Sequence, residues 1–176
     1  MTQNFDDKVL IVTGGNQGIG RAASIAASRL GASVVVASRT EKTGIETVQI
    51  IEKSKGKAIY VKTDVSDEAS VVNLIEKTLK YFGSLDMAFN NAGGGATSAN
   101  PVSTLEQSVE DWDTTINNNL KGTWLCMKHE IPPMLQSGKG SIVNMSSIAG
   151  VRPGPVAGPS YTAAKSGIAG LTGMAG

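Results

Sequence analysis

Two residues near the end of the chain have the types and the spacing for proton transfer. Tyr161 and Lys165 lie four positions apart in "GPSYTAAKSG", which places both side chains on one face of a helix. A tyrosine phenol with its ordinary pKa of about 10 is a poor base at neutral pH. A positive charge about 4 Å away is worth about 4 kcal/mol at an effective dielectric constant of about 20, or roughly three pKa units. Such a pair could therefore exchange a proton with an alcohol or carbonyl oxygen.

The same spacing also occurs by coincidence on solvated helix surfaces, so the pair needs support from the rest of the sequence. A glycine-rich turn offers the first support. The segment "TGGNQGIG" contains Gly14, Gly18 and Gly20 and joins an apolar run to an alanine-rich stretch. Glycines in such a turn let the backbone approach a pyrophosphate, and the following helix N-terminus offers free N–H groups to the anion. The spacing differs from G-x-G-x-x-G, and a plain turn without a ligand is the alternative.

The end of the second apolar run indicates which dinucleotide would bind. An acidic residue at this point would hold the 2′-hydroxyl of NAD, but "VVVASRT" carries Ser38 and Arg39. A guanidinium group beside a hydroxyl suits a 2′-phosphate, so NADP(H) is favoured and NAD(H) is possible. An ordinary surface arginine is the alternative.

The alternation of β-branched runs with longer stretches of helical period predicts how these residues are positioned. The runs are almost continuously apolar, which predicts strands covered on both faces, as in a parallel sheet. The whole pattern predicts a Rossmann-type α/β fold, a doubly wound parallel sheet in three α/β/α layers, with ligands beyond the carboxyl ends of the strands. The expected strands are 8–14, 32–38, 57–65, 85–93 and 140–147, and the expected helices are 18–31, 41–56, 67–83 and 111–135.

Composition argues against several classes of partner and site. The chain is 40% hydrophobic and 18% charged, with a net charge of +1 and no dense run of Lys or Arg. Neither nucleic acid nor an anionic membrane is therefore indicated as a partner. The polar start lacks the pattern of a signal peptide, and no apolar run reaches the length of a membrane span, which predicts a cytoplasmic protein. Cys126 and His129 are each alone, so neither a disulfide framework nor a metal site is expected.

The motifs also occur in an informative order. The segments "TGGNQGIG", "NNAG", "NNNLKG", "SS" and "YTAAK" follow one another between Val9 and Thr172. This order resembles the short-chain dehydrogenase/reductase family, whose pattern is T-G-x-x-x-G-x-G, N-N-A-G, N-x-x-G, S and Y-x-x-x-K. The resemblance implies an NAD(P)-dependent oxidoreductase that interconverts an alcohol and a ketone or aldehyde by hydride transfer.

The resemblance also implies roles for individual residues. Tyr161 would be the general acid and base, Lys165 would bind the nicotinamide ribose, and Asn119 would hold a water on a proton relay. Ser147 would orient the substrate oxygen, but its distance from Tyr161 is one residue longer than is usual in the family, so Ser146 is the alternative. The cofactor-binding residues would be Gly14, Asn16, Gln17, Gly18, Ile19, Gly20, Ser38, Arg39, Asp64, Val65, Asn91, Ala92, Gly93, Tyr161 and Lys165.

Members of the family typically continue through further strands and a segment that covers the substrate. Residues 1–176 would therefore form a single dinucleotide-binding oxidoreductase domain without these parts, and we expect it to be inactive alone. One alternative is a catalytically silent relative that binds NADP. Another is a nucleotide-sugar epimerase or dehydratase, against which the glycine spacing counts. A small-molecule substrate and a homo-oligomer, either tetramer or dimer, are implied by the resemblance, with 119–130 and 161–172 as contact faces.

Overall fold

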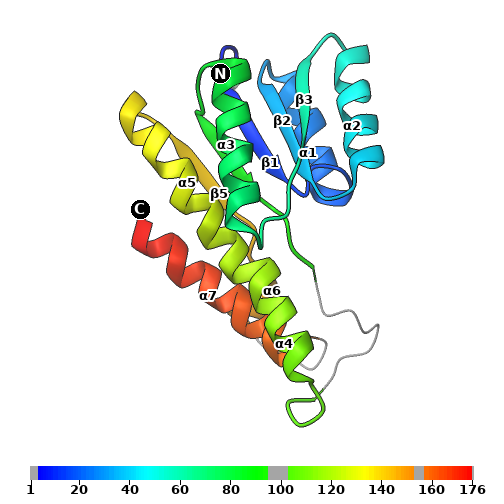
Figure 1. Cartoon of the computed structure of the whole chain (residues 1–176), viewed down its shortest axis with the longest axis vertical. Helices are drawn as coiled ribbons and strands as arrows, with labels where there is room; N and C mark the ends of the chain where they lie inside the picture. The colour runs from blue at the N-terminus through cyan, green and yellow to red at the C-terminus, as the bar shows by residue number, and fades with distance from the viewer. Residues whose placement is uncertain (1–3, 95–102, 153–156, 176) are drawn as a thin grey trace.

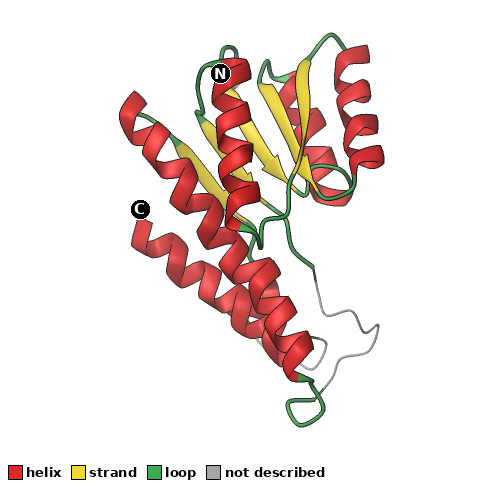
Figure 2. Ribbon diagram, in the orientation of Figure 1, coloured by secondary structure: helices red, strands yellow, loops and turns green. Residues whose placement is uncertain are grey.

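The computed structural model describes residues 4–94, 103–152 and 157–175. Five parallel strands form one sheet in the order β3-β2-β1-β4-β5, and helices cover both of its faces (Figure 1, Figure 2). The predicted doubly wound α/β fold is therefore confirmed. The strands are β1 (Val9–Thr13), β2 (Ser33–Ser38), β3 (Lys57–Lys62), β4 (Met87–Asn90) and β5 (Ser141–Asn144). The helices are α1 (Gly18–Arg29), α2 (Glu41–Lys53), α3 (Glu68–Phe82), α4 (Val109–Ile116), the π-helical turn η1 (Asn117–Lys121), α5 (Gly122–Ser137), α6 (Ile148–Val151) and α7 (Pro159–Ala175).

The centre of the sheet is its most deeply buried part. Every residue of β1 is buried, and so is all of β2 after Ser33. Helices α1 and α2 pack on one face, and α3 and α5 pack on the other. Val12 belongs to the apolar core under α1 and α2, whereas Ile11 belongs to the core under α3 and α5. Because neighbouring residues of a strand point to opposite faces, a continuous apolar run fills both cores.

The two edge strands, β3 and β5, are less deeply buried than the central strands, so the cover on both faces is incomplete at the edges of the sheet. The residues of β5 alternate between exposed and half-buried, and Val143 is 58% exposed. At the ends of β3, Lys57 and Lys62 are exposed. An edge strand has a neighbour on one side alone, and the flanking helices cover it incompletely.

The expected helix 111–135 is part of a longer helical segment with an irregular centre. Helix α4 passes into η1 and then into α5 without a break. The side-chain amide of Asn119 donates to the backbone oxygen of Thr115 (2.9 Å), and the Thr123 hydroxyl donates to the backbone oxygen of Asn119 (2.7 Å). Side-chain bonds of this kind compete with the regular helical ladder. The apolar period gave no sign of the π turn, a feature that is frequent at functional sites.

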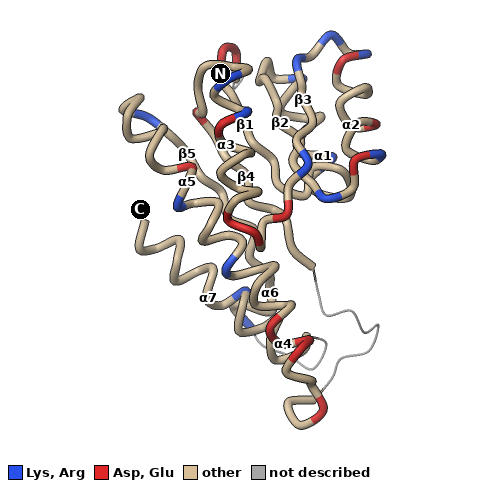
Figure 3. Tube along the Cα trace, in the orientation of Figure 1, with Lys and Arg blue, Asp and Glu red and all other residues tan. Residues whose placement is uncertain are grey.

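Helix α7 carries the Tyr161–Lys165 pair and lies beside α4 and η1 (Figure 1). Lys165 is the one charged residue of this helix (Figure 3). It lies on the buried side together with Ala164 and Ile168. A lysine on the buried side of an otherwise uncharged helix is unusual, because burial removes its ammonium group from water.

Candidate functional site

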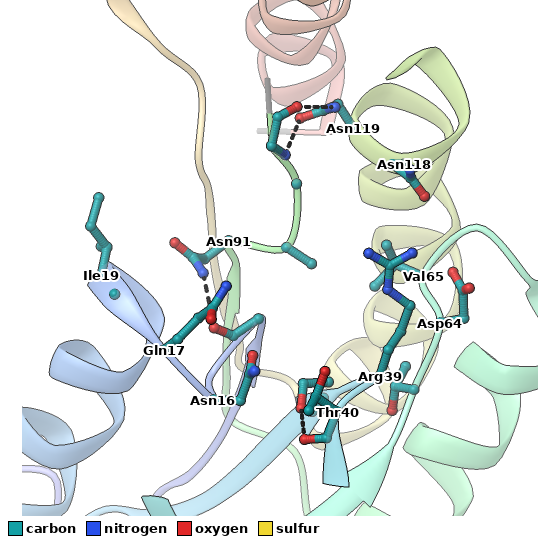
Figure 4. Close-up of a pocket in the computed structure, with 18 of the residues that line it drawn as sticks. Asn16, Gln17, Ile19, Arg39, Thr40, Asp64, Val65, Asn91, Asn118 and Asn119 are labelled. Atoms are coloured by element: carbon teal, nitrogen blue, oxygen red, sulfur yellow. Dashed lines mark hydrogen bonds between the residues drawn. The ribbon is translucent and has the colours of Figure 1, made fainter. Parts of the chain in front are cut away.

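A cavity of about 440 Å³ opens at the carboxyl ends of β1, β2, β3 and β4 (Figure 4). Most of the residues that the sequence predicted to bind a cofactor line this cavity. They are Gly14, Asn16, Gln17, Gly18, Ile19, Ser38, Arg39, Asp64, Val65, Asn91, Ala92 and Gly93, and Asn119 lines it as well. Gly20, Ser147, Tyr161 and Lys165 do not line it. The structure therefore brings the glycine turn, the ends of β2 and β3 and the segment after β4 together around one cavity, whereas Ser147, Tyr161 and Lys165 are not part of its lining.

The backbone conformation of the turn before α1 depends on its glycines. Gly14 and Gly18 adopt backbone φ angles of 65° and 52°, which residues other than glycine rarely adopt. A Cβ atom on Gly20 would overlap the backbone oxygen of Gly14, so α1 can start this close to the turn because Gly20 has no side chain. The side chain of Gln17, the residue before α1, does not cap the helix. The helix N-terminus is therefore available to an anion.

Arg21 braces the glycine turn, a role that the sequence did not reveal. Its Nε atom donates to the backbone oxygen of Asn16 (2.9 Å) and to the hydroxyl of Thr47 (3.0 Å). The side-chain amide of Asn16 donates in turn to the Thr43 hydroxyl (2.8 Å). Because Thr43 and Thr47 belong to α2, these bonds tie the turn to a second helix. The sequence signal was a basic residue directly after the third glycine, and its partners could be found in three dimensions alone.

The ends of β2 and β3 form the polar side of the cavity. The Ser38 hydroxyl donates to the backbone oxygen of Thr40 (3.3 Å), and the Arg39 side chain extends along the cavity on the side of Asp64 and Val65 (Figure 4). Burial by itself would raise the pKa of Asp64, but hydrogen bonds from Ser66 and the positive charge of Arg39 hold it below its usual value. Arg39 and Asp64 are therefore electrostatically coupled at this end of the cavity.

Thr13 joins β1 to the start of the "NNAG" segment, and sequence reasoning missed it. Its hydroxyl oxygen accepts the backbone N–H groups of Asn91 and Ala92, both at 3.0 Å. The Asn91 side chain donates back to the backbone oxygen of Thr13 (3.0 Å). These three bonds fix the backbone where β4 ends and the cavity begins.

The side chain of Asn119 fastens η1 to the same segment. Its Nδ2 atom donates to the backbone oxygen of Gly94 (3.0 Å), and its Oδ1 atom accepts the Gly94 N–H (3.3 Å). With the bond to Thr115 described above, both ends of the amide are engaged. The water that Asn119 was expected to hold stays a prediction.

Lys165 and Tyr161 lie together on α7, as the spacing predicted. The Lys165 Nζ atom is 5.6 Å from the centroid of the Tyr161 ring and donates to the backbone oxygen of Met145 (2.8 Å). Lys165 is 3% exposed, and this burial lowers the pKa of its ammonium group. A Cβ atom on Gly93 would lie 3.5 Å from Nζ, so the ammonium group lies against the wall of the cavity. The structure thus places a buried amine between Tyr161 and the end of β4.

The neighbouring serines after β5 have different partners. The Ser146 hydroxyl donates its proton to the backbone oxygen of Lys165 (2.8 Å). The Ser147 oxygen instead accepts the N–H of Ala149 (3.2 Å) and caps α6. In the hydrogen bonds of residues 4–94, 103–152 and 157–175, Ser147 acts as an acceptor alone, so its proton is available for a ligand. This difference favours Ser147 over Ser146 as the substrate-orienting residue.

A buried carboxyl group lies on α5, and its position in the sequence gave no sign of this burial. Glu130 on α5 is fully buried, and its Oε2 atom accepts a hydrogen bond from the Asn90 side chain (2.9 Å). The same Asn90 amide donates to Asn144 on β5 (3.0 Å). Burial raises the pKa of Glu130 to about 7, although the bond from Asn90 acts in the opposite direction. Within the described residues, Glu130 Oε1 and Asn90 Oδ1 have no hydrogen-bond partner.

The described residues also bear on what the sequence indicated about metal ligands, Cys126 and membrane-spanning helices. In the described part of the chain, no three His, Cys, Asp or Glu side chains come together in a way that could hold a metal ion. Cys126 is buried in α5, and this burial, together with the charge of Glu130, raises the pKa of its thiol well above the usual value. None of the helices within the described ranges is both long enough and apolar enough to cross a membrane.

Comparison with known sequences gives a consistent set of matches. The profile of the family described as short chain dehydrogenase matches residues 8–175. A 3beta-hydroxysteroid dehydrogenase of Mediterraneibacter gnavus is 41% identical over 168 residues, which are 96% of this chain and 59% of the relative. A 2,5-dichloro-2,5-cyclohexadiene-1,4-diol dehydrogenase of Sphingobium indicum is 41% identical over 173 residues, which are 98% of this chain and 66% of the relative. The chain thus spans less than two thirds of the length of these relatives.

Solved structures of a reductase and a dehydrogenase have a similar fold. Levodione reductase superposes with a TM-score of 0.91 at 29% identity, over 96% of this chain and 65% of the reductase. An NAD⁺-bound xylitol dehydrogenase superposes with a TM-score of 0.91 at 25% identity, over 97% of this chain and 64% of that enzyme.

Proposed function

The chain belongs to the short-chain dehydrogenase family, and on this premise we propose that it binds a nicotinamide dinucleotide and interconverts an alcohol with a ketone or aldehyde. The observation that carries this proposal is the buried Lys165, which lies beside Tyr161 and against the wall of the cavity at Gly93. Burying an ammonium group costs free energy, and a packed core alone gives no reason to bear that cost. A site that uses the charge does give one.

The lining of the cavity supports a dinucleotide site. The glycine turn and the N-terminus of α1 would hold the pyrophosphate, because Gly20 leaves no side chain between them. Asp64 and Val65 would hold the adenine end. Ser38 and Arg39 would bind a 2′-phosphate, which favours NADP(H), although the structural neighbour with bound NAD⁺ keeps NAD(H) open. When bound, the cofactor supplies or accepts the hydride.

The proton that accompanies the hydride would be moved by residues of this chain. The Tyr161 hydroxyl would donate it to the oxygen of the carbonyl substrate, or take it from the alcohol in the reverse direction. The positive charge of Lys165, 5.6 Å from the Tyr161 ring, would favour the ionised tyrosine. The Ser147 hydroxyl, whose oxygen already accepts the Ala149 N–H, would donate its proton to the same substrate oxygen and orient it. Asn119 would hold a relay water between Lys165 and solvent.

The substrate would be a small alcohol or carbonyl compound. The two relatives named above act on a hydroxysteroid and on a cyclic diol, so cyclic secondary alcohols are the first compounds to test. The cytoplasmic location and the homo-oligomer, dimer or tetramer, rest on the sequence and stay predictions.

The test is an assay of NADPH and NADH oxidation with a panel of cyclic and linear carbonyl compounds. It uses the 176-residue chain and the same chain extended by the C-terminal segment of a relative. Turnover in the extended form should fall by about 10³-fold or more in Tyr161→Phe, the loss expected when a general acid is removed, with the cofactor Kd almost unchanged. Cofactor binding without turnover of any compound in either form would favour the silent relative. Turnover by the short form would contradict the expectation that it is inactive alone.

A further inference from the structure

A glutamine far from Tyr161 in the sequence holds the start of the helix that carries this tyrosine. Gln107 lies next to Ser108, the N-cap residue of α4. Its Nε2 atom donates to the hydroxyl of Ser160 (2.6 Å), and its Oε1 atom accepts the backbone N–H of Ser160 (3.1 Å). One side-chain amide therefore makes two hydrogen bonds to one residue that is 53 positions away.

The position of Ser160 gives these bonds their importance. Ser160 is the second residue of α7, is fully buried and directly precedes Tyr161. The first N–H groups of a helix have no partner within the helix, and leaving one unpaired in a buried place destabilises the helix start. Gln107 supplies that partner from another element, so it acts as a distant cap of α7.

Gln107 is itself well placed to be a fixed point. Its backbone N–H donates to the oxygen of Ser103 (3.2 Å) in the turn that leads to α4. The next residue, Ser108, caps α4 by accepting the N–H of Asp111 (3.1 Å). The glutamine backbone is thus held on both sides, and its half-buried side chain reaches α7 from a rigid position.

The two members of the Tyr161–Lys165 pair are anchored in different ways. Lys165 is held by two bonds of its own, from the Ser146 hydroxyl to its backbone oxygen and from its Nζ atom to Met145. Tyr161 lies one turn earlier, where the anchored residue is its neighbour Ser160. A loss of the Gln107 bonds should therefore displace Tyr161 and leave Lys165 in place.

We propose that Gln107 is a positioning residue for Tyr161: through its two hydrogen bonds to Ser160 it fixes the first turn of α7 and with it the place of the Tyr161 hydroxyl. The inference rests on the proposed function. It predicts a defect in the rate of turnover rather than in cofactor binding, because the cofactor cavity and Lys165 are held by other contacts.

Two nearly isosteric substitutions separate the hydrogen bonds from the space that the side chain fills. Gln107→Met removes both bonds. Gln107→Glu keeps both, because a carboxylate can accept the Ser160 N–H, and the Ser160 hydroxyl can turn its proton toward the second oxygen. Negative charge near a helix N-terminus is also favourable. The glutamate variant should therefore behave like the wild type.

The experiment measures three quantities in these variants, in the form of the protein that turns over. Gln107→Met should lower kcat by about tenfold or more, as expected for a misplaced catalytic group, and leave the Kd for NADPH unchanged. Gln107→Glu should restore kcat to within about threefold of the wild type, so that the two variants differ by an amount well outside ordinary assay error. Hydrogen exchange of the Ser160 amide, which needs no turnover, should accelerate in Gln107→Met and remain slow in Gln107→Glu.

Ile168→Val is the matched control, because it weakens the buried side of α7 without touching the anchor. It should lower the thermal stability of the protein and leave kcat unchanged. The proposal is overturned if Gln107→Met keeps the wild-type kcat while Tyr161→Phe is inactive, or if Ile168→Val lowers kcat as much as Gln107→Met does. Should Tyr161→Phe turn over like the wild type, the proposed function fails and takes this inference with it.

Discussion

The two halves of the sheet differ in the kind of side chain that is buried in them. In the half formed by β1, β2 and β3, the central strands are apolar, and the cavity at the carboxyl ends is lined by the glycine turn together with Arg39 and Asp64. In the half formed by β4 and β5, buried polar side chains meet beside the apolar contacts of residues such as Ala88 and Phe89. Asn90, Glu130 and Asn144 meet in the interior there, and β5 remains largely uncovered.

The difference shows how the proposed roles are divided. A dinucleotide is a large anion that backbone N–H groups and a helix N-terminus can hold, so the first half has little need for buried charge. The proposed proton transfer needs ionisable side chains in a defined place, and the buried Lys165 lies beside Tyr161 on α7, away from the glycine turn. Glu130 is a second buried ionisable group outside the cavity. Side-chain substitutions should therefore disturb rate and pH behaviour in the second half, and backbone crowding should disturb the first.

The largest effect is expected from the removal of the buried charge. Lys165→Met keeps the length and apolar character of the side chain but removes the ammonium group beside Tyr161. We expect kcat to fall by about 10³-fold, within the range of a lost acid–base function, and the Kd for the cofactor to rise. Lys128→Met, on the exposed side of α5, is the control and should keep the wild-type kcat. A wild-type rate in Lys165→Met would remove the distinction between the two halves.

The second prediction concerns Glu130 and the pH dependence of stability. Its pKa is raised to about 7 in the folded protein, so the folded state binds the proton more tightly than the unfolded chain does. The stability that this provides is complete below about pH 4.5 and is lost as the pH rises through 7, a change of about 3 kcal/mol. Glu130→Gln, which cannot ionise, should lack this loss and be the more stable protein at pH 8.

Urea unfolding at pH 5, 6, 7 and 8 measures the free energy of unfolding of both proteins. The other titrating groups, such as Asp64 and Asp86, are the same in both, so the difference between the two curves reports Glu130 alone. Parallel curves would show that the Glu130 carboxyl group is not buried in the neutral form.

The third prediction concerns a substitution that crowds the backbone of the first half of the sheet. Gly20→Ala places a Cβ atom against the backbone oxygen of Gly14. We expect it to destabilise the protein by about 1–3 kcal/mol and to weaken cofactor binding, because the turn must shift away from α1. Gly173→Ala, where a Cβ atom would meet nothing within 4 Å, should instead stabilise α7 slightly. If both variants have the same thermal stability and cofactor affinity, the close approach at Gly20 is not needed.

The smallest effect is expected at the rim of the cavity. Arg39→Ala should weaken NADP(H) binding and spare NAD(H), because a 2′-phosphate loses a charged hydrogen bond that a 2′-hydroxyl does not need. The range for such a bond is about 1–3 kcal/mol, and the exposure of Arg39 places the expected loss near its lower end. Isothermal titration with both cofactors is the measurement. Equal losses for the two would show that Arg39 packs against the adenine or does not bind at all.

The sequence alone determined the family and the outline of the fold. The alternation of apolar runs and helical stretches gave the parallel sheet, since each pattern depends on residues that are neighbours in the chain. The glycine turn was equally evident, because Gly14, Gly18 and Gly20 act within one short segment. Of the cofactor-binding residues predicted outside α7, all but Gly20 line the cavity.

The tertiary structure alone decided which polar side chains meet. Nothing near Gln107 in the sequence points to Ser160, and Arg21 gave no hint of its bonds to α2. The sequence around Glu130 is that of an ordinary helix, and only the fold shows that Asn90 lies beside it in the interior. A hydrogen bond or a pKa depends on burial and on distances of a few ångströms between segments that are far apart in the chain, and these distances are set when the helices and the sheet pack together.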